Sequence, residues 1–344
     1  MLITVKYVDG LPLARFEHVM ARSGVSLPRQ TQARWIIEVS QALQPLVNLA
    51  RDHLLACPVI HMDETRMQVL KEPDRAASAL SYMWVHIGGP PGKRVVLFDY
   101  ETSRSAEVPE RLLAGYKGYL MTDGYPGYNQ VGSDKHITHL ACWAHARRPF
   151  FALADIEASA RRKAEGKAAA PISPLALEIV QRMDRLFEIE RGINGKPADE
   201  RRAVRQKLSR ILVDELETRM RAERPKLSRG NDLAKAMDYM LKRWPAFTRF
   251  LDDGRVCLSN NAAERGLRGI ALGRKSWLFA GSDRGGERAA AMYSLIVTAK
   301  MNDIDPQTWL ADVLARIAGH PATRLDELLP WNWRHAEAAL HRAA

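Results

Sequence analysis

The sequence predicts an α/β protein in which a mixed-sheet core is interrupted by an all-helical insertion and flanked by helices at both ends. Short apolar, β-branched runs separated by turn residues between positions 56 and 155 are typical of buried strands. Strand signals are missing from 156–249, where apolar residues recur every three or four positions, as in amphipathic helices. The same helical spacing dominates the first 55 residues and the residues after 260.

These patterns divide the chain into five segments. We expect an N-terminal helical segment (1–55), a first part of the core (56–155), a helical insertion (156–249), a second part of the core (250–301) and a C-terminal helical extension (302–344). A chain of 344 residues has room for about two domains of ordinary size.

The first segment predicts a helix near 14–20, a break at 23–28 that contains Gly24, and a longer helix to about Leu55. This order resembles a helix-turn-helix, whose second helix reads bases with polar side chains at its front. The residues at 29–32, Arg-Gln-Thr-Gln, suit that role. A plain helical hairpin packed on the next domain fits the pattern equally well.

The core segment predicts strands at 59–63, 66–70, 81–87 and 95–100, a short helix at 109–115, a strand at 118–123, and a strand from 137 that leads into a helix ending near 151. A helix between strands indicates a mixed sheet with a crossover. The insertion predicts helices near 175–187, 208–220 and 233–244. After Asn260 we expect a helix, a basic-aromatic stretch at 273–282, helices near 286–301 and 306–318, and a docked tail at 328–333.

Charge and cysteine content restrict the class of protein. The net charge is +11 and the isoelectric point is near 9.7, which favours a polyanionic partner. The three cysteines, Cys57, Cys142 and Cys257, are too far apart for a zinc finger or a disulfide framework. No apolar run is long enough for a membrane span, and the first residues do not resemble a signal peptide. We therefore expect a cytoplasmic, nucleoid-associated protein with no membrane partner.

Three acidic residues are candidates for a metal site. Asp63 and Asp123 each close a short apolar run, so we expect both at strand tips, and Glu264 stands where a helix begins. Carboxylates that converge from such elements form the all-oxygen site that Mg²⁺ prefers. Each residue also has an ordinary explanation. Aspartate often closes a strand as a turn former, and Asn261 with Glu264 has the spacing of a capping box.

Several longer stretches resemble the insertion-sequence 66 transposase family. They are His-Met-Asp-Glu-Thr at 61–65, Asp-Gly-Tyr at 123–125, Ala-Cys-Trp-Ala-His-Ala-Arg-Arg at 141–148, Asn-Asn-Ala-Ala-Glu-Arg at 260–265, Gly-Arg-Lys-Ser-Trp-Leu-Phe-Ala-Gly-Ser at 273–282 and Leu-Leu-Pro-Trp-Asn-Trp at 328–333. The similarity to the family follows the same order along the chain, from near residue 1 to about 333. Full members of the family carry a further N-terminal zinc-finger and leucine-zipper region, which we expect this chain to lack.

The resemblance implies a DDE transposase with an RNase H-like core that cleaves DNA strands and transfers them. Asp63, Asp123 and Glu264 would then be the catalytic, metal-binding acids, with two Mg²⁺ ions, for which Mn²⁺ could substitute. The partner would be double-stranded DNA, at transposon ends and target, with self-association on the DNA. Two other functions stay open: a truncated DNA-binding remnant or regulator, and an RNase H-like nuclease without strand transfer.

Further residues are expected near these acids. The resemblance assigns supporting roles to His61 and Glu64. Asn261 lies in the same motif as Glu264, and we include it among the supporting residues. The basic residues beside the third acid are candidates to hold DNA phosphates; they are Arg265, Arg268, Arg274 and Lys275. Trp277 could stack on an unpaired base. Alternatively, residues 277–279 form a buried strand with a solvated basic end.

Overall fold

A computed structural model describes residues 1–131, 135–154, 161–166 and 173–333. Within it the chain forms two compact units. The first, here called the sheet unit, comprises Met1–Gly118, Pro126–Ile137 and the chain from Ala262 onward. The second, here called the helical unit, comprises Tyr119–Tyr125 and Thr138–Asn261. The parts of the predicted insertion at 156–160 and 167–172, and the predicted extension beyond 333, lie outside the described residues.

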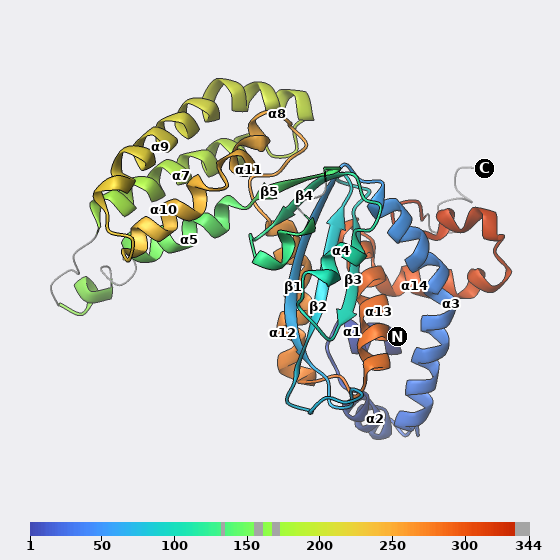
Figure 1. The fold of residues 1–344 in the computed structure, drawn as a ribbon. Coiled ribbons are helices and arrows are strands. Elements are labelled where there is room, and N and C mark those ends of the chain that lie inside the picture. Colours follow the sequence, from blue (N-terminus) through green and yellow to red (C-terminus); the bar gives the residue numbers. More distant parts are fainter. Residues whose placement is uncertain (132–134, 155–160, 167–172, 334–344) are drawn as a thin grey trace. The chain divides into compact units, whose positions relative to one another are not determined.

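The α/β class is confirmed by a mixed five-stranded sheet with the strand order β3-β2-β1-β4-β5 (Figure 1). The strands are β1 (Val59–Gln68), β2 (Leu80–Gly88), β3 (Val95–Glu101), β4 (Gly118–Thr122) and β5 (Ile137–Ala141). The pairs β1–β2 and β2–β3 are antiparallel. A short helix, α4 (Glu107–Leu112), lies between β3 and β4 in the chain.

One strand, β1, replaces the two strands that the sequence predicted at 59–63 and 66–70. Its pairing with β2 is continuous from His61 opposite Ile87 to Gln68 opposite Leu80. Glu64 and Thr65 stand opposite Trp84 and Met83 within this ladder, and neither breaks a strand as Gly or Pro would. Asp63 therefore lies in the middle of a strand, and the prediction that it ends one is wrong.

Helices cover both faces of the β1–β3 sheet. On one face lie α12 (Asn261–Trp277) and α13 (Asp283–Met301); a ring contact at 6.0 Å joins Phe98 of β3 to Tyr293 of α13. On the other face, Asp99 of β3 pairs with Arg51 of α3 at 2.7 Å, and Trp84 contacts the ring of Tyr128. Burial on both faces explains why Val95 to Phe98 is an unbroken apolar run instead of an alternating one.

Helix α13 runs beside the outer edge of β3 (Figure 1), and a ladder of side chains at its inner face pairs with that edge. The backbone N–H groups of Arg94, Val96 and Phe98 donate to Asn302, Thr298 and Ser294, at 2.9, 3.0 and 2.8 Å. These three acceptors recur every four residues, which places them on one face of a helix. They take the place of a neighbouring strand along an edge that would otherwise be open to pairing.

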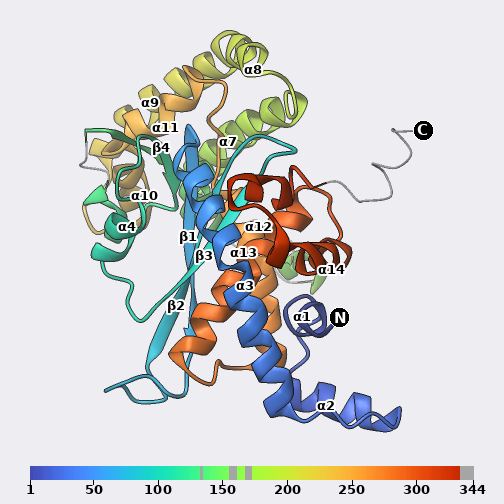
Figure 2. The ribbon, with the colours of Figure 1, turned by 90° about the vertical axis from the view of Figure 1, so that its right-hand side faces the viewer.

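The N-terminal helices are α1 (Leu2–Tyr7), α2 (Leu13–Arg22) and α3 (Arg29–Leu55). The predicted break at 23–28 is present, with Gly24 at a φ of 75°. In Figure 2, α3 runs beside the sheet unit's other helices, and its inward residues, such as Leu43 and Leu46, are fully buried. At the C-terminus, α14 (Pro306–Arg316) is followed by a tail whose residue Leu328 accepts a hydrogen bond from the Trp309 indole at 3.0 Å, so the predicted docking of the tail is confirmed.

The helical unit is built around Trp143, which is 1% exposed. Its helices are α5 (Trp143–Ala154), α7 (Pro174–Gly192), α8 (Ala198–Val204), α9 (Arg210–Glu223), α10 (Asp232–Leu241) and α11 (Trp244–Thr248). The Trp143 indole donates to the Phe247 carbonyl at 2.9 Å, and its ring contacts Trp244 and Phe250. The three helices that the sequence predicted in this region are confirmed as α7, α9 and α10.

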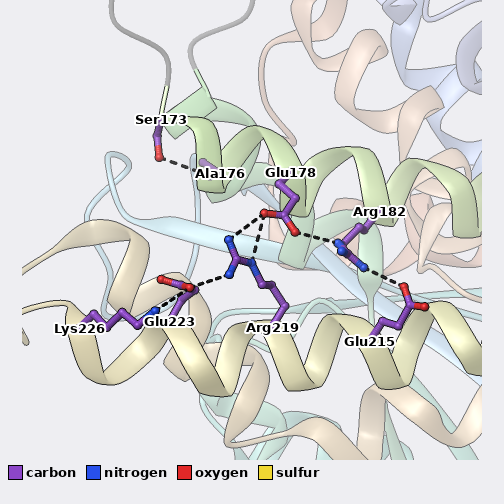
Figure 3. Close-up of polar contacts among 8 residues, drawn as sticks. All are labelled: Ser173, Ala176, Glu178, Arg182, Glu215, Arg219, Glu223 and Lys226. Atoms are coloured by element: carbon purple, nitrogen blue, oxygen red, sulfur yellow. Dashed lines mark hydrogen bonds and ion pairs between the residues drawn. The ribbon is translucent and has the colours of Figure 1, made fainter.

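An ion-pair network links α7 to α9 (Figure 3). Glu178 of α7 pairs with Arg182 at 3.1 Å and with Arg219 of α9 at 3.2 Å, and Arg182 also pairs with Glu215 at 3.0 Å. Many of the arginines in this unit are thus neutralised by neighbouring acids. None of the helices in the described part of the chain has the length and apolarity that crossing a membrane requires.

Candidate catalytic acids and their surroundings

The side chain of Asp63 projects toward the sheet face on which α12 packs. Asp63 stands opposite Val85, and His61 opposite Ile87; such cross-strand partners share a face. A Cβ atom placed on Gly266 of α12 would lie 2.8 Å from Cδ1 of Ile87 and 3.4 Å from Cγ2 of Val85. The helix therefore meets the sheet at the row of residues that includes Asp63. One carboxylate oxygen of Asp63 accepts the N–H of Glu64 at 2.8 Å.

Glu264 lies in the first turn of α12, two positions before Gly266. Residues two positions apart on a helix project in different directions, so Gly266 fixes how the helix packs and not where the Glu264 side chain points. The absence of a side chain at Gly266 lets the helix backbone approach Val85 and Ile87 closely. Asp63 is on β1, and α12, which carries Glu264, packs on the residues of the neighbouring strand β2 that stand opposite Asp63 and His61. Asp63 and Glu264 are both half-buried. Asn261 is the first residue of the helix and is exposed.

Asp123 lies in the helical unit directly after β4, as the sequence predicted for a strand tip. Its Oδ1 accepts the N–H of Tyr125 at 2.9 Å, the turn-forming bond common for aspartate. The hydroxyl of Tyr239 donates to its carbonyl at 3.1 Å. Gly124, at a φ of 86°, is required here because a side chain would overlap the Tyr239 hydroxyl.

Residues that the sequence analysis missed surround Asp123. Burial and the nearby Arg243 guanidinium lower the pKa of His139 to about 4, against the opposing charge of Asp123. Nε2 of His139 lies 2.7 Å from the Thr122 hydroxyl, and Arg243 lies over the Tyr239 ring at 4.7 Å. No local motif connects these residues, because Tyr239 is 116 positions from Asp123.

The two supporting residues next to Asp63 point in opposite directions. His61 is 3% exposed and shares the α12 face with Asp63. Glu64 points to the other face, where it pairs with Arg104 and accepts the Tyr128 hydroxyl at 2.6 Å. Its side chain is only 1% exposed. Glu64 therefore anchors the segment around Tyr128 against β1.

The basic candidates fall into two groups. Arg265, Arg268 and Lys275 are exposed on α12, where they are open to a ligand. Arg274 instead donates to the Thr65 hydroxyl at 3.1 Å and to the Arg66 carbonyl at 2.7 Å, so it fastens the end of α12 to β1. At the front of α3, Gln32 is fully buried and donates to the Leu27 carbonyl, which removes it from base reading.

The basic-aromatic stretch at 273–282 is not a separate element, since residues through Trp277 form the last turns of α12. The alternative of a buried strand at 277–279 is wrong. Leu278 and Phe279 are 64% and 42% exposed, because a tight turn follows the helix. In that turn the N–H of Phe279 donates to the Trp277 carbonyl at 2.7 Å.

Two family models match this chain. Residues 1–288 match the model described as Transposase IS66 family, and residues 294–331 match the IS66 C-terminal element. The chain belongs to the IS66 transposase family. The resemblance inferred from the motifs is thereby confirmed.

Curated relatives agree with this membership. Uncharacterized protein y4hP of Sinorhizobium fredii (strain NBRC 101917 / NGR234) is 46% identical over 336 residues, which cover 95% of this chain and 60% of the relative. Uncharacterized proteins y4jD and y4qI of the same organism are each 34% identical, over 97% and 96% of this chain and 65% and 61% of their own lengths. The chain thus spans less than two thirds of the curated relatives that it matches.

The donor set of this IS66 member suits a hard cation, since carboxylates are the preferred ligands of Mg²⁺. Asp63 and Glu264 belong to the sheet unit and Asp123 to the helical unit. Within residues 1–131, 135–154, 161–166 and 173–333, no three acidic, histidine or cysteine side chains form a cluster that could hold a metal ion. The acids therefore have the right chemical type for such a cation, and the described part of the structure does not gather three of them into one site.

Proposed function

We propose that this chain is the catalytic part of a DDE transposase that cleaves DNA at the ends of an insertion sequence and joins it to a target. The observation that carries the proposal is that α12, the helix with Glu264, packs on the sheet face toward which Asp63 projects, in a member of the IS66 family. We also propose that the sheet is an RNase H-like core and that 156–249 is inserted into it. Most of that range falls in the helical unit's α7 to α11.

In the proposed reaction, Asp63, Asp123 and Glu264 hold two Mg²⁺ ions, for which Mn²⁺ could substitute. When bound, these ions neutralise charge on the phosphate and lower the pKa of a coordinated water. In the first displacement, water attacks the phosphorus at the element's end and forms a new P–O bond. The bond between phosphorus and O3′ breaks, which leaves a free 3′-hydroxyl. In the second displacement, that hydroxyl attacks a target phosphodiester, a new P–O bond forms, and the target's own P–O3′ bond breaks to leave a target 3′-hydroxyl. One phosphodiester is exchanged for another, so no nucleotide cofactor is consumed.

The protein's own residues hold the DNA. Arg265, Arg268 and Lys275 are exposed on the helix that carries Glu264 and would contact duplex phosphates. The net charge of +11 adds a long-range attraction for DNA. We also propose that the protein self-associates when it is bound to DNA. Its proposed location is the cytoplasm, in association with the nucleoid.

The test is strand cleavage of a duplex that carries the element's end, with Mg²⁺, for Asp63→Asn, Asp123→Asn and Glu264→Gln. Each change keeps the shape of the side chain and removes the charge that attracts the cations. Cleavage is expected to fall by several orders of magnitude, about 10³-fold or more by analogy with the loss of other charge-stabilising groups. DNA binding should change far less.

Asp232→Asn, an exposed aspartate at the start of α10, is the matched control and should cleave normally. If Glu264 serves only as a helix cap, Glu264→Gln, which keeps a capping side chain at this position, will retain full cleavage, and the proposal fails. Nicked products without any joined product would assign hydrolysis without strand transfer.

A further inference from the structure

A cavity of about 240 Å³ lies within the sheet unit, where α1, the end of α12 and the start of α13 meet. Its polar lining comes from Lys6, Tyr7, Trp277, Ser282, Arg288 and Tyr293. One water needs only roughly 10–15 Å³ of such space, so the cavity has room for a ligand. None of the candidate acids lines it. Trp277 is about 20 Å from Glu264 along α12, at about 1.5 Å per residue.

Two cations face this cavity without an acidic partner. No Asp or Glu lines it, and neither Lys6 nor Arg288 forms an ion pair with any residue that the structure describes. Burial and the nearby Arg288 guanidinium lower the pKa of Lys6, which shows that the two charges repel each other in a partly desolvated place. An anion between them would relieve that repulsion.

Aromatic rings also line the cavity, and the Lys6 ammonium lies over one of them, that of Tyr7, at 5.2 Å. Tyr7 and Tyr293 are 8% and 5% exposed, and their rings meet edge to face at 5.4 Å. The Nε1–H of Trp277 is buried and has no hydrogen-bond acceptor in place among the described residues, although the Tyr293 hydroxyl is close enough to interact with it. Buried indole N–H groups usually have a partner, and the Tyr293 hydroxyl is the candidate.

The turn after Trp277 maintains this arrangement. Leu278 adopts a φ of 63°, which is uncommon for a leucine, and its side chain points outward at 64% exposure. Two residues of the cavity lining, Ser282 and Gly285, belong to the start of α13. The amino end of this long helix adds partial positive charge at the same place.

We propose that the cavity binds a nucleotide unit of an unpaired DNA strand, with the phosphate between Lys6 and Arg288 and the base against the Trp277 and tyrosine rings. Two cations fit an anion, and the rings fit a base, for which stacking contributes about 1–3 kcal/mol. This inference rests on the proposed function, because it assigns the nucleotide to the DNA substrate. A free nucleotide has the same chemistry, and the experiment separates the two sources.

The experiment titrates the full chain with dTMP, thymidine and inorganic phosphate by ligand-observed NMR, and with a labelled five-nucleotide thymidylate strand by fluorescence anisotropy. We expect dTMP to bind more tightly than thymidine or phosphate, and the strand to displace dTMP. In the double variant Lys6→Gln, Arg288→Gln, the Kd for dTMP should rise by roughly tenfold or more, as expected for the loss of charge-assisted hydrogen bonds. Ala289→Leu, which fills the cavity without a change of charge, should also abolish binding.

The control is the double variant Arg284→Gln, Lys300→Gln, which also removes two positive charges, from exposed positions of α13. It should bind dTMP normally. Binding that survives both Lys6→Gln, Arg288→Gln and Ala289→Leu overturns the proposal, as does a wild-type chain that binds neither dTMP nor the strand. If dTMP binds in the cavity but the strand does not displace it, the assignment to DNA is wrong. Asp63→Asn separates the two proposals, since it should bind dTMP normally while cleavage is lost.

Discussion

At the scale of single residues, Gly266 decides how closely α12, the helix with Glu264, packs on β2. A side chain there would overlap Ile87, whereas Gly269 on the same helix has nothing within 4 Å of the position that a Cβ would occupy. The close approach of α12 to the sheet thus depends on one missing side chain. The motif that contains Glu264 is therefore only part of what places the carboxylate.

Gly266→Val should separate α12 from β2 and lower the free energy of unfolding by about 1–3 kcal/mol, the usual cost of overpacking. Cleavage should fall further than the stability loss explains, because Glu264 moves with the helix. Gly269→Ala is the matched control; it should stabilise the helix by up to about 1 kcal/mol and leave cleavage unchanged. Thermal melting and the cleavage assay check both variants. Normal activity of a folded Gly266→Val protein would contradict this role.

His139 predicts a pH dependence of stability. Its folded pKa of about 4 is below the roughly 6.5 of an unfolded histidine. Between these values the unfolded chain binds the proton and the folded chain does not. With respect to His139, the free energy of unfolding is therefore highest above about pH 6.5, and it decreases as the pH falls toward 4. His139→Gln should flatten the stability profile in that window, measured by urea unfolding without metal. His18→Gln, at an exposed position of α2, should leave the profile as it is.

At the scale of elements, the edge strand β3 depends on α13. Thr298 is 2% exposed; its hydroxyl accepts the N–H of Val96 and lies 3.0 Å from the Val96 carbonyl. Thr298→Val keeps the shape and removes both contacts, which leaves buried backbone groups without partners. We expect a loss of about 1–3 kcal/mol and faster hydrogen exchange at Val96. Thr102→Val, at an exposed position just after β3, should have little effect; equal losses in the two variants would show that the ladder does not stabilise the edge.

At the scale of the whole molecule, the chain divides into two compact units. Trp143 is central to the helical unit, and Trp143→Ala should cost about 3–5 kcal/mol there. Hydrogen exchange should then accelerate in α7 and α10 while the β1–β2 amides keep their protection. Trp35→Ala is the control, since Trp35 is 42% exposed on α3. Uniform loss of protection in both units would show that they unfold as one.

Local patterns in the sequence were sufficient for the positions of most helices and strands, because the spacing of apolar residues reports which face of an element is buried. They were also sufficient for the motifs around Asp63, Asp123 and Glu264 and for the family. The continuity of β1 through Thr65 could not be predicted, since it depends on pairing with Leu80 to Gly88 of another strand. The opposite directions of Asp63 and Glu64 followed only once that strand was known to be unbroken.

The remaining features depend on contacts between residues far apart in the chain. The lowered pKa of His139 arises from burial and from Arg243, and the cavity brings Lys6 together with Trp277 and Arg288. No local pattern connects these positions, because burial and the distance between two charges exist only in the folded chain. The sequence thus identifies which residues can do chemistry, and packing decides which of them meet.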